Sequence, residues 1–363
     1  MYTVFHIKNF RCFDDLVLDD LARVNLLAGK NNVGKTALLE ALFLHCGAYN
    51  PALTLNLNAF RGIDTITVEF GRSARMPWDA LFNQLDASKS IELTGENSES
   101  GRRVLRLNSV RQVEELSKIR QTLESRTNGQ DAISSASESV QVLSLEYEEE
   151  AGQNGRTYLI FDQQKGRVEP AAPPPPFPGF FLASRVRIPL NDDAQRYGNL
   201  VRQRKQNMVV NALQAIESRL ISLTALPVGN ISIIHGDVGL KELIPLPDLG
   251  DGMNRLASIV LAIGNAPNGV VLVDEIENGL HHSILKDVWK AIAKAARAFN
   301  TQVFATTHSL ECIRAAHQAF SESEVYDFRY HRLDRNEKTN RIEVVTYDQR
   351  LIEASIQADF EVR

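Results

Sequence analysis

An eight-residue glycine-rich stretch, "GKNNVGKT", constrains the fold of this 363-residue chain more than any other feature. It fits the pattern G-x-x-x-x-G-K-[ST] through Gly29, Gly34, Lys35 and Thr36. The apolar run "RVNLLAG" leads into it, and "KTALLEALFLHCG" follows with the apolar face and glycine stop of a helix. A strand, a tight loop and a helix in this order predict an α/β fold that binds phosphate groups.

The residue types of this loop indicate how a nucleotide is held. The two glycines let the backbone curl around phosphate oxygens, and consecutive backbone N–H groups at the helix start stabilise the negative charge. We expect Lys35 to reach the β and γ phosphates of ATP and the hydroxyl of Thr36 to ligate Mg²⁺. The expected nucleotide-binding residues of the loop are Gly29, Lys30, Asn31, Asn32, Val33, Gly34, Lys35, Thr36 and Ala37. A chance match is the alternative, and the strand–loop–helix context argues against it.

An acidic pair follows another apolar run in "VVLVDEIENGLH". The run predicts a buried strand that delivers Asp274 at its carboxyl end, where ligands bind in α/β sheets. We expect Asp274 to hold the Mg²⁺ shell through water. Glu275 lies one residue further, points elsewhere and is the natural general base for an attacking water. The alternative is a pair of solvated carboxylates at a strand end.

Histidines follow two of the expected strands. His308 ends "VFATTHS", where an imidazole can hydrogen-bond a γ phosphate and sense its loss. The alternative is a local capping role, because Ser309 has the features of an N-cap for "LECIRAAHQAF". His281 and His282 are adjacent, so we expect their side chains to diverge rather than to share a metal with His308. The expected catalytic residues are therefore Lys35, Glu275 and His308.

Apolar strands alternate with helices along much of the chain, which indicates a mostly parallel sheet flanked by helices. Strands are expected over 1–10, 23–29, 63–70, 90–96, 180–185, 231–236, 268–275 and 301–309. Helices are expected over 35–47, 109–126, 198–225, 253–264 and 282–300. A hairpin is expected over 140–169, after a loop at 127–139 and before an extended proline-rich connector at 170–180.

These elements suggest four regions. Residues 1–100 form an N-terminal ATPase lobe with the phosphate loop, and 101–180 form an inserted helix and hairpin region that ends in the proline-rich connector. An antiparallel β subdomain is also expected beside the main sheet. Residues 181–315 form a C-terminal ATPase lobe with the acidic pair and His308, and 316–363 form a C-terminal extension.

The order of motifs completes a family pattern once "LGDGMNRL", residues 249–256, is included. The sequence resembles the ATP-binding-cassette ATPases of the SMC-related branch. More narrowly, it is similar to the stand-alone ATPases related to the overcoming-lysogenization-defect (OLD) family, including ATPase subunits of bacterial anti-phage systems. The resemblance covers roughly 1–100 and 180–315, and it implies a P-loop NTPase fold of the ABC/SMC type.

In that family, the signature turn of one subunit closes over the γ phosphate bound by the other. The resemblance therefore implies a homodimer or a higher homo-oligomer in which Gly250, Asp251 and Gly252 contact the nucleotide of a second copy. Gly250 replaces the family's serine and Asp251 its first glycine, so the serine hydroxyl contact is lost. Gly252 at a helix start still presents backbone N–H groups to an anion.

The resemblance also assigns the neighbouring loops. The family's inter-subunit loop falls on 278–281, with His281 where many relatives have Asp, and Gln84 is the candidate for the glutamine lid contact. Full OLD-type enzymes carry a Toprim nuclease after the ATPase. The residues after His308 lack its acidic cluster, so we expect this chain to regulate a separately encoded effector such as a Toprim-like nuclease.

Composition leaves alternatives open. The net charge is −5, so any DNA contact needs a local basic patch. Such a cluster exists, opposed by Asp192 and Asp193, and it fits either a DNA-binding repair or clamping ATPase or a solvated helix face. Its members are Arg185, Arg187, Arg196, Arg202, Arg204 and Lys205. A third hypothesis is that the protein is a scaffold that binds ATP without hydrolysing it.

Three scattered cysteines, no apolar run of about 18 residues and no signal peptide predict a cytoplasmic protein without a membrane span.

Overall fold

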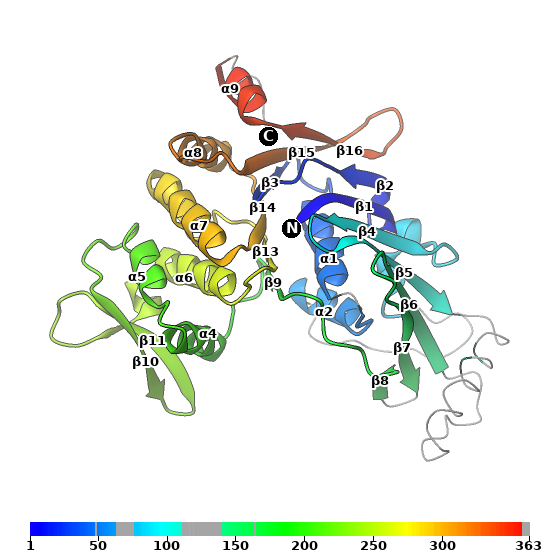
Figure 1. Cartoon of the computed structure of the whole chain (residues 1–363), viewed down its shortest axis with the longest axis horizontal. Coiled ribbons are helices and arrows are strands. Elements are labelled where there is room, and N and C mark those ends of the chain that lie inside the picture. Colours follow the sequence, from blue (N-terminus) through cyan, green and yellow to red (C-terminus); the bar gives the residue numbers. More distant parts are fainter. Residues whose placement is uncertain are drawn as a thin grey trace.

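Two large sheets with a helix between them form the framework of the chain (Figure 1). The computed structural model describes residues 1–47, 49–62, 76–110, 116, 119, 140–162 and 165–357. Helix α1 (Lys35–Cys46) contacts strands of both sheets. On the other face of the six-stranded sheet lie α6 (Asp251–Gly264), α7 (Leu285–Phe299) and α8 (Leu310–Ser321).

The six-stranded sheet carries the motifs. Its order is β16-β15-β3-β14-β13-β9, and every neighbouring pair is parallel except β15 and β16. The bounds are β3 Val24–Ala28, β9 Gly179–Leu182, β13 Val270–Val273, β14 Gln302–Thr306, β15 Phe328–Arg335 and β16 Ile342–Tyr347. The expected parallel sheet is confirmed, and the carboxyl ends of the three motif-bearing strands, β3, β13 and β14, meet at one edge.

Strand β13 shows why the sheet needs helices on both faces. Val271 and Val273 pack into the core formed with α6 and α7, whereas Val270 and Leu272 pack into the core formed with α1. All four side chains are buried, because successive residues of a strand point to opposite faces. The apolar run before Asp274 is therefore the signature of a strand covered on both sides.

The seven-stranded sheet is antiparallel throughout, in the order β2-β1-β4-β5-β6-β7-β8. Its strands are β1 Tyr2–Phe10, β2 Phe13–Leu18, β4 Ile91–Asn97, β5 Gly101–Val110, β6 Val140–Glu149, β7 Asn154–Asp162 and β8 Lys165–Glu169. One face buries Phe5 and Leu105 with the residues of α1. The other carries cross-strand ion pairs such as Arg106 with Glu92 at 3.0 Å. The expected antiparallel subdomain and the hairpin within 140–169 are confirmed.

The expectation of a long helix over 198–225 is wrong. The segment is divided into α4 (Leu190–Arg202), α5 (Asn207–Leu213) and β10 (Ser222–Val228). Arg204 adopts a left-handed conformation with φ 58°, which ends the first helix. Strand β10 pairs with β11 (Ile231–Asp237), and β12 (Ile244–Pro245) completes a three-stranded sheet. Pairing with the next strand in a tight hairpin overrides the helix propensity of the segment, and Leu223 is buried there.

Other differences are smaller. Ser109 and Val110 end β5 instead of starting a helix. Most of the helix expected over 109–126 lies outside the described residues, as do the strand expected at 63–70 and the loop at 127–139. Helices α2 (Leu53–Phe60) and α9 (Gln349–Gln357) were not expected. In the described part of the chain, no helix is both long and apolar enough to cross a membrane.

Strands β15 and β16 were also missed, although β15 pairs directly with β3 beside the phosphate loop. Strand β15 is covered on both faces: Phe328 and Tyr330 pack into the core formed with α7 and α8, and Leu333 packs into the core beside α1. The last part of the described chain therefore completes the central sheet rather than following it.

Candidate active site

The phosphate loop follows β3 and requires its two glycines. Gly29 has φ 134°, and a Cβ there would lie 2.1 Å from the carbonyl oxygen of Leu333. Gly34 has φ 96°, and a Cβ there would lie 2.5 Å from the thiol of Cys12. Both positions exclude any side chain, because the backbone conformation and the space are each available only to glycine.

Lys35 is buried at the start of α1. Its ammonium group donates to the carbonyl oxygens of Gly29 at 2.7 Å and Lys30 at 2.9 Å. Burial lowers the pKa of Lys35, and the nearby carboxylates of Asp274, Glu275 and Glu277 oppose that effect. The cation thus lies inside the loop that is expected to surround phosphate groups.

The other loop residues divide by exposure. Lys30, Asn31 and Asn32 are exposed, whereas Val33 and Ala37 are buried in the core beside α1. Because the side chains of Val33 and Ala37 pack in the core, only their backbone N–H groups are candidates for phosphate contacts.

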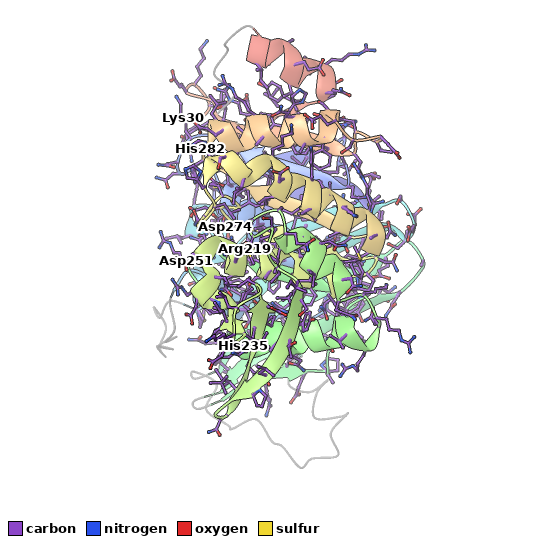
Figure 2. The ribbon with its side chains drawn as sticks, turned by 90° about the vertical axis from the view of Figure 1, so that its left-hand side faces the viewer. Lys30, Arg219, His235, Asp251, Asp274 and His282 are labelled. Carbon is purple, nitrogen blue, oxygen red and sulfur yellow. The ribbon has the colours of Figure 1, made fainter. Side chains whose placement is uncertain are left out.

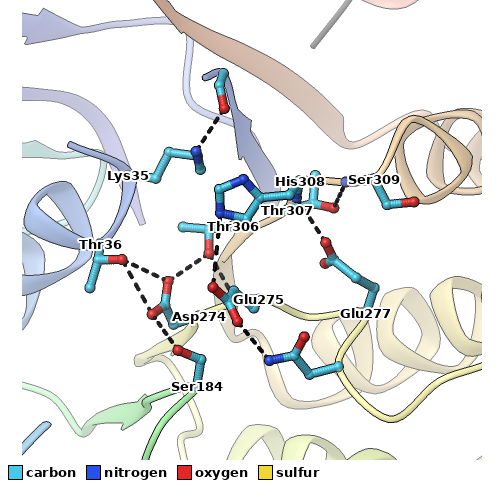
Figure 3. A network of polar contacts seen from close by, with 12 residues as sticks. Lys35, Thr36, Ser184, Asp274, Glu275, Glu277, Thr306, Thr307, His308 and Ser309 are labelled. Carbon is cyan, nitrogen blue, oxygen red and sulfur yellow. Dashed lines mark hydrogen bonds and ion pairs between the residues drawn. The ribbon is translucent and has the colours of Figure 1, made fainter. Parts of the chain in front are cut away.

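Asp274 is the centre of a hydroxyl network (Figure 3). Thr36 donates to its two carboxylate oxygens at 3.1 and 3.3 Å, Ser184 donates at 3.1 Å and Thr306 at 2.7 Å. Ser184 follows β9 and Thr306 ends β14, the strands on either side of β13. Three hydroxyl donors thus satisfy the oxygens of this buried carboxylate. The sequence interpretation missed Ser184 and Thr306, whose signal is a small hydroxyl residue at the carboxyl end of a buried strand.

Glu275 has an unusual backbone conformation, with φ 50°. Its N–H donates to the hydroxyl of Thr306 at 2.8 Å, and its carboxylate accepts from the side-chain amide of Asn278 at 2.7 Å. The other carboxylate oxygen lies 3.9 Å from Nε2 of His308. The left-handed residue therefore turns its side chain away from Asp274 and toward His308, as Figure 3 shows.

The backbone around His308 is tied to the same loop. The N–H of His308 donates to the carboxylate of Glu277 at 2.8 Å. Ser309 also caps α8, since its hydroxyl accepts from the N–H of Cys312. Capping by Ser309 is thus confirmed, and it leaves the imidazole of His308, 42% exposed, facing Glu275.

Arg255 joins α6 to the acidic pair and was missed in the sequence. Its guanidinium donates to the carbonyl oxygen of Asp274 at 2.7 Å and, at 3.4 Å, to that of Glu275. Burial lowers the pKa of Arg255, and the carboxylates of Asp274, Glu275 and Glu277 act in the opposite direction.

The glycine turn lies at the start of α6. Gly250 has φ 117°, and a Cβ on Gly252 would lie 2.9 Å from the carbonyl oxygen of Gly279. Asp251 is 79% exposed and lies 3.9 Å from the guanidinium of Arg187. Within the described residues, no hydrogen bond or ion pair joins residues 250–252 to residues 29–37. Figure 2 shows Lys30, His282 and Asp251 along one edge of the molecule.

Two expectations about the remaining candidates need comment. The side chains of His281 and His282 do not diverge: their rings lie 4.2 Å apart, and Nδ1 of His281 is 2.8 Å from the hydroxyl of Ser283. The expected divergence is wrong, because the chain turns into a short helix at His282 and brings the two rings together. Gln84 lines a cavity of about 450 Å³ with Arg11 and does not line the network around Asp274.

A parallel sheet with a phosphate loop after one strand and an acidic pair after another defines a P-loop nucleoside triphosphatase of the ABC/SMC type. Comparison with protein families matches residues 24–314 to the family described as "AAA domain, putative AbiEii toxin, Type IV TA system". The match spans most of the chain, and the protein belongs to this family.

Individual relatives agree with this class. An "ATP/GTP phosphatase" of Helicobacter pylori is 25% identical over 353 residues, which cover 88% of each chain. The crystal structure of an SMC head bound to the C-winged helix domain of ScpA aligns with a TM-score of 0.50 and 11% identity. That alignment covers 98% of this chain and 99% of the SMC head, and it shows likeness of fold.

Proposed function

We propose that the protein is an ATP-hydrolysing switch that dimerises around ATP and gates a separately encoded effector in anti-phage defence. The observation that carries the proposal is the convergence at Asp274. Its carboxylate contacts Thr36 of the phosphate loop, and the adjacent Glu275 faces His308. Binding, catalytic and sensing candidates thus lie around one point.

The residues present suit a magnesium nucleotide. A hydroxyl of Thr36 and a carboxylate of Asp274 offer hard oxygen ligands side by side, which is the donor set that Mg²⁺ prefers. Among the described residues, no cluster of three or more His, Cys, Asp and Glu could hold a metal ion. The phosphate oxygens and water are therefore needed to complete the shell. Mg²⁺ would supply charge neutralisation for those oxygens.

Glu275 is placed to act as the general base. Its carboxylate is 36% exposed, fixed by Asn278 and directed to the same space as His308, so it is free to take a proton from a water molecule. His308 then responds to the terminal phosphate, and Lys35 neutralises its charge. The relative named an ATP/GTP phosphatase supports hydrolysis of a purine nucleotide, so GTP belongs in the tests beside ATP.

The exposed glycine turn supports the proposed dimerisation. Residues 250–252 have no polar contact with the phosphate loop of their own chain, and the N-terminus of the 14-residue α6 starts there. A helix N-terminus is suited to an anion, so a second copy's nucleotide is the proposed ligand of the turn.

Support for an effector comes from relatives. The family description names a toxin of a toxin–antitoxin system, and the solved SMC head is bound to a domain of another protein. Both are compatible with an ATPase whose nucleotide state is read by a partner.

The decisive test uses Glu275→Gln and Lys35→Ala. Glu275→Gln should lower kcat by about 10²-fold or more while ATP and Mg²⁺ convert the protein to a stable dimer. Lys35→Ala should abolish both hydrolysis and ATP-driven dimerisation. Size-exclusion chromatography with light scattering measures the mass; only monomer for Glu275→Gln at saturating ATP contradicts the proposal.

DNA binding is the second candidate function, and two residues of the basic cluster already make contacts within the chain. Arg196 pairs with Asp193 at 2.9 Å, and Lys205 lies over the ring of Phe299. The remaining arginines are exposed: Arg185, Arg187, Arg202 and Arg204. DNA-stimulated hydrolysis with a steep salt dependence would favour this function, and its loss on changing the four arginines to glutamine would locate the site.

A further inference from the structure

Among the described residues, Arg255 makes the one side-chain hydrogen-bonding link from α6 to the backbone of the acidic pair. Its Nη2 donates to the carbonyl oxygen of Asp274 at 2.7 Å and lies 3.4 Å from that of Glu275. Both contacts come from the same nitrogen, Nη2, which lies one bond further from Cα than the ammonium nitrogen of a lysine, so a lysine at this position falls short of the two carbonyl oxygens. The contact joins the helix of the glycine turn to the expected general base.

The backbone that Arg255 contacts is strained. Glu275 has φ 50°, a conformation that non-glycine residues rarely adopt and that persists only where neighbouring groups enforce it. The N–H of Glu275 donates to the hydroxyl of Thr306. Arg255 donates to the carbonyl oxygens of Asp274 and of Glu275 itself. Moving Arg255 therefore releases one of the constraints on the direction of the Glu275 side chain, beside those from Thr306 and Asn278.

The start of α6 is packed against the same loop. Gly252 approaches the carbonyl oxygen of Gly279 so closely that an added Cβ would lie 2.9 Å from it. Gly279 in turn is close to Asp251, since a Cβ there would lie 3.5 Å from that residue's Cβ. A displacement of the first turn of α6 must consequently be transmitted to residues 275–279, both through this packing and through Arg255.

We infer that Arg255 is a positioning residue that makes the orientation of Glu275 depend on whether the glycine turn of the same chain is engaged by nucleotide. The inference rests on the proposed function, in which that turn contacts the nucleotide of the second copy. Glu275 acts on the nucleotide of its own chain. Arg255 thus links two nucleotide sites, and hydrolysis at one site rises when the other is filled.

The test compares Arg255→Lys with wild type and with a matched control, Arg23→Lys. Arg23 is also a largely buried arginine that donates to a backbone carbonyl, that of Ala296, but it lies away from the acidic pair. Wild type should hydrolyse ATP with a sigmoidal dependence on ATP concentration. Arg255→Lys should lower kcat by about tenfold or more, the effect expected of a displaced catalytic group, and should make the dependence hyperbolic with KM within about twofold. Arg23→Lys should retain both the rate and the sigmoidal form.

A second measurement separates positioning from folding. Arg255→Lys should retain ATP-driven dimerisation in the Glu275→Gln background, because the turn and the phosphate loop are intact. An Arg255→Lys enzyme with unchanged kcat and sigmoidal form, or one that has lost ATP binding and dimerisation, overturns the inference. If wild type neither hydrolyses ATP nor dimerises, the proposed function fails and the inference with it. If wild type does both and Arg255→Lys matches Arg23→Lys, the inference alone fails.

Discussion

The hydroxyl of Thr36 lies 3.1 Å from a carboxylate oxygen of Asp274, although the two residues are 238 positions apart in the chain. The contact exists because β3 and β13 are parallel strands separated only by β14, so their carboxyl ends deliver the two motifs to the same place. It joins the phosphate loop directly to the acidic pair.

The contact between Thr36 and Asp274 predicts how nucleotide binding depends on Mg²⁺. Asp274→Asn keeps the shape of the side chain and removes its charge, so the Mg²⁺-dependent part of nucleotide binding should be lost. Hydrolysis should fall by about 10²-fold or more. Calorimetric titration with ATP, with and without Mg²⁺, measures the difference. Equal enhancement of binding by Mg²⁺ in wild type and variant would contradict the assignment.

The hydroxyl network predicts a graded effect on stability. Ser184→Ala removes one donor to Asp274 and should cost about 1 kcal/mol of unfolding free energy. Thr306→Val removes the donor to Asp274 and also the acceptor for the Glu275 N–H, so it should cost more and should lower kcat as well. Denaturant unfolding and steady-state kinetics measure both variants. A larger loss of stability in Ser184→Ala than in Thr306→Val would reverse the expected order.

Gly250 stands where related ATPases have a serine, and substitution by serine tests whether this turn accepts a side chain. Gly250→Ser has free space, since no atom lies within 4 Å of an added Cβ, but the backbone has φ 117° and ψ 153°. Residues with a side chain rarely adopt this conformation, so the variant should lose about 1–3 kcal/mol of unfolding free energy. Gly198→Ser is the matched control, because Gly198 has the same free space within α4 and no positive φ. Equal stability of the two variants would show that the turn is not constrained as described.

The candidate site was predictable where its residues follow apolar strands. The runs before Gly29, Asp274 and His308 specify buried parallel strands, and the carboxyl ends of such strands share one edge. Ser184, Thr306 and Arg255 were missed because their roles depend on neighbours supplied by other strands and by α6. The position of Ser184 and Thr306 at the ends of buried strands is the signal that could have found them, whereas no local pattern distinguishes Arg255.

The errors in the fold have the same origin. The segment 198–225 has the composition of a helix, yet the pairing of Leu223 and its neighbours with β11 converts its end into a strand. Strand β15 was missed because charged residues interrupt its apolar ones, and only its place beside β3 explains why Tyr330 and His331 are buried. Short-range patterns identify elements whose own sequence decides their structure, and they fail where pairing with another strand decides it.

Two fully buried histidines predict how stability depends on pH. Burial lowers the pKa of His45 and of His331 to about 3, so both are neutral in the folded protein. In the unfolded chain they titrate near the ordinary value of about 6.5. Between these values the unfolded state binds more protons than the folded state, so unfolding free energy should fall as pH decreases from about 6.5 toward 3. Each histidine should contribute a slope of up to about 1.4 kcal/mol per pH unit.

The histidine prediction is checked by denaturant unfolding at several pH values in this window. His331→Gln retains groups that can bond the hydroxyl of Thr346 and the side-chain amide of Asn25, the present partners of the imidazole. The variant should remove about one histidine's share of the slope, and combining it with His45→Gln should remove both shares. The single variant should also be less sensitive to acid than wild type even if its stability at neutral pH is lower. A pH slope unchanged in the double variant would assign the acid sensitivity to carboxylates such as those of the ion pairs on the seven-stranded sheet.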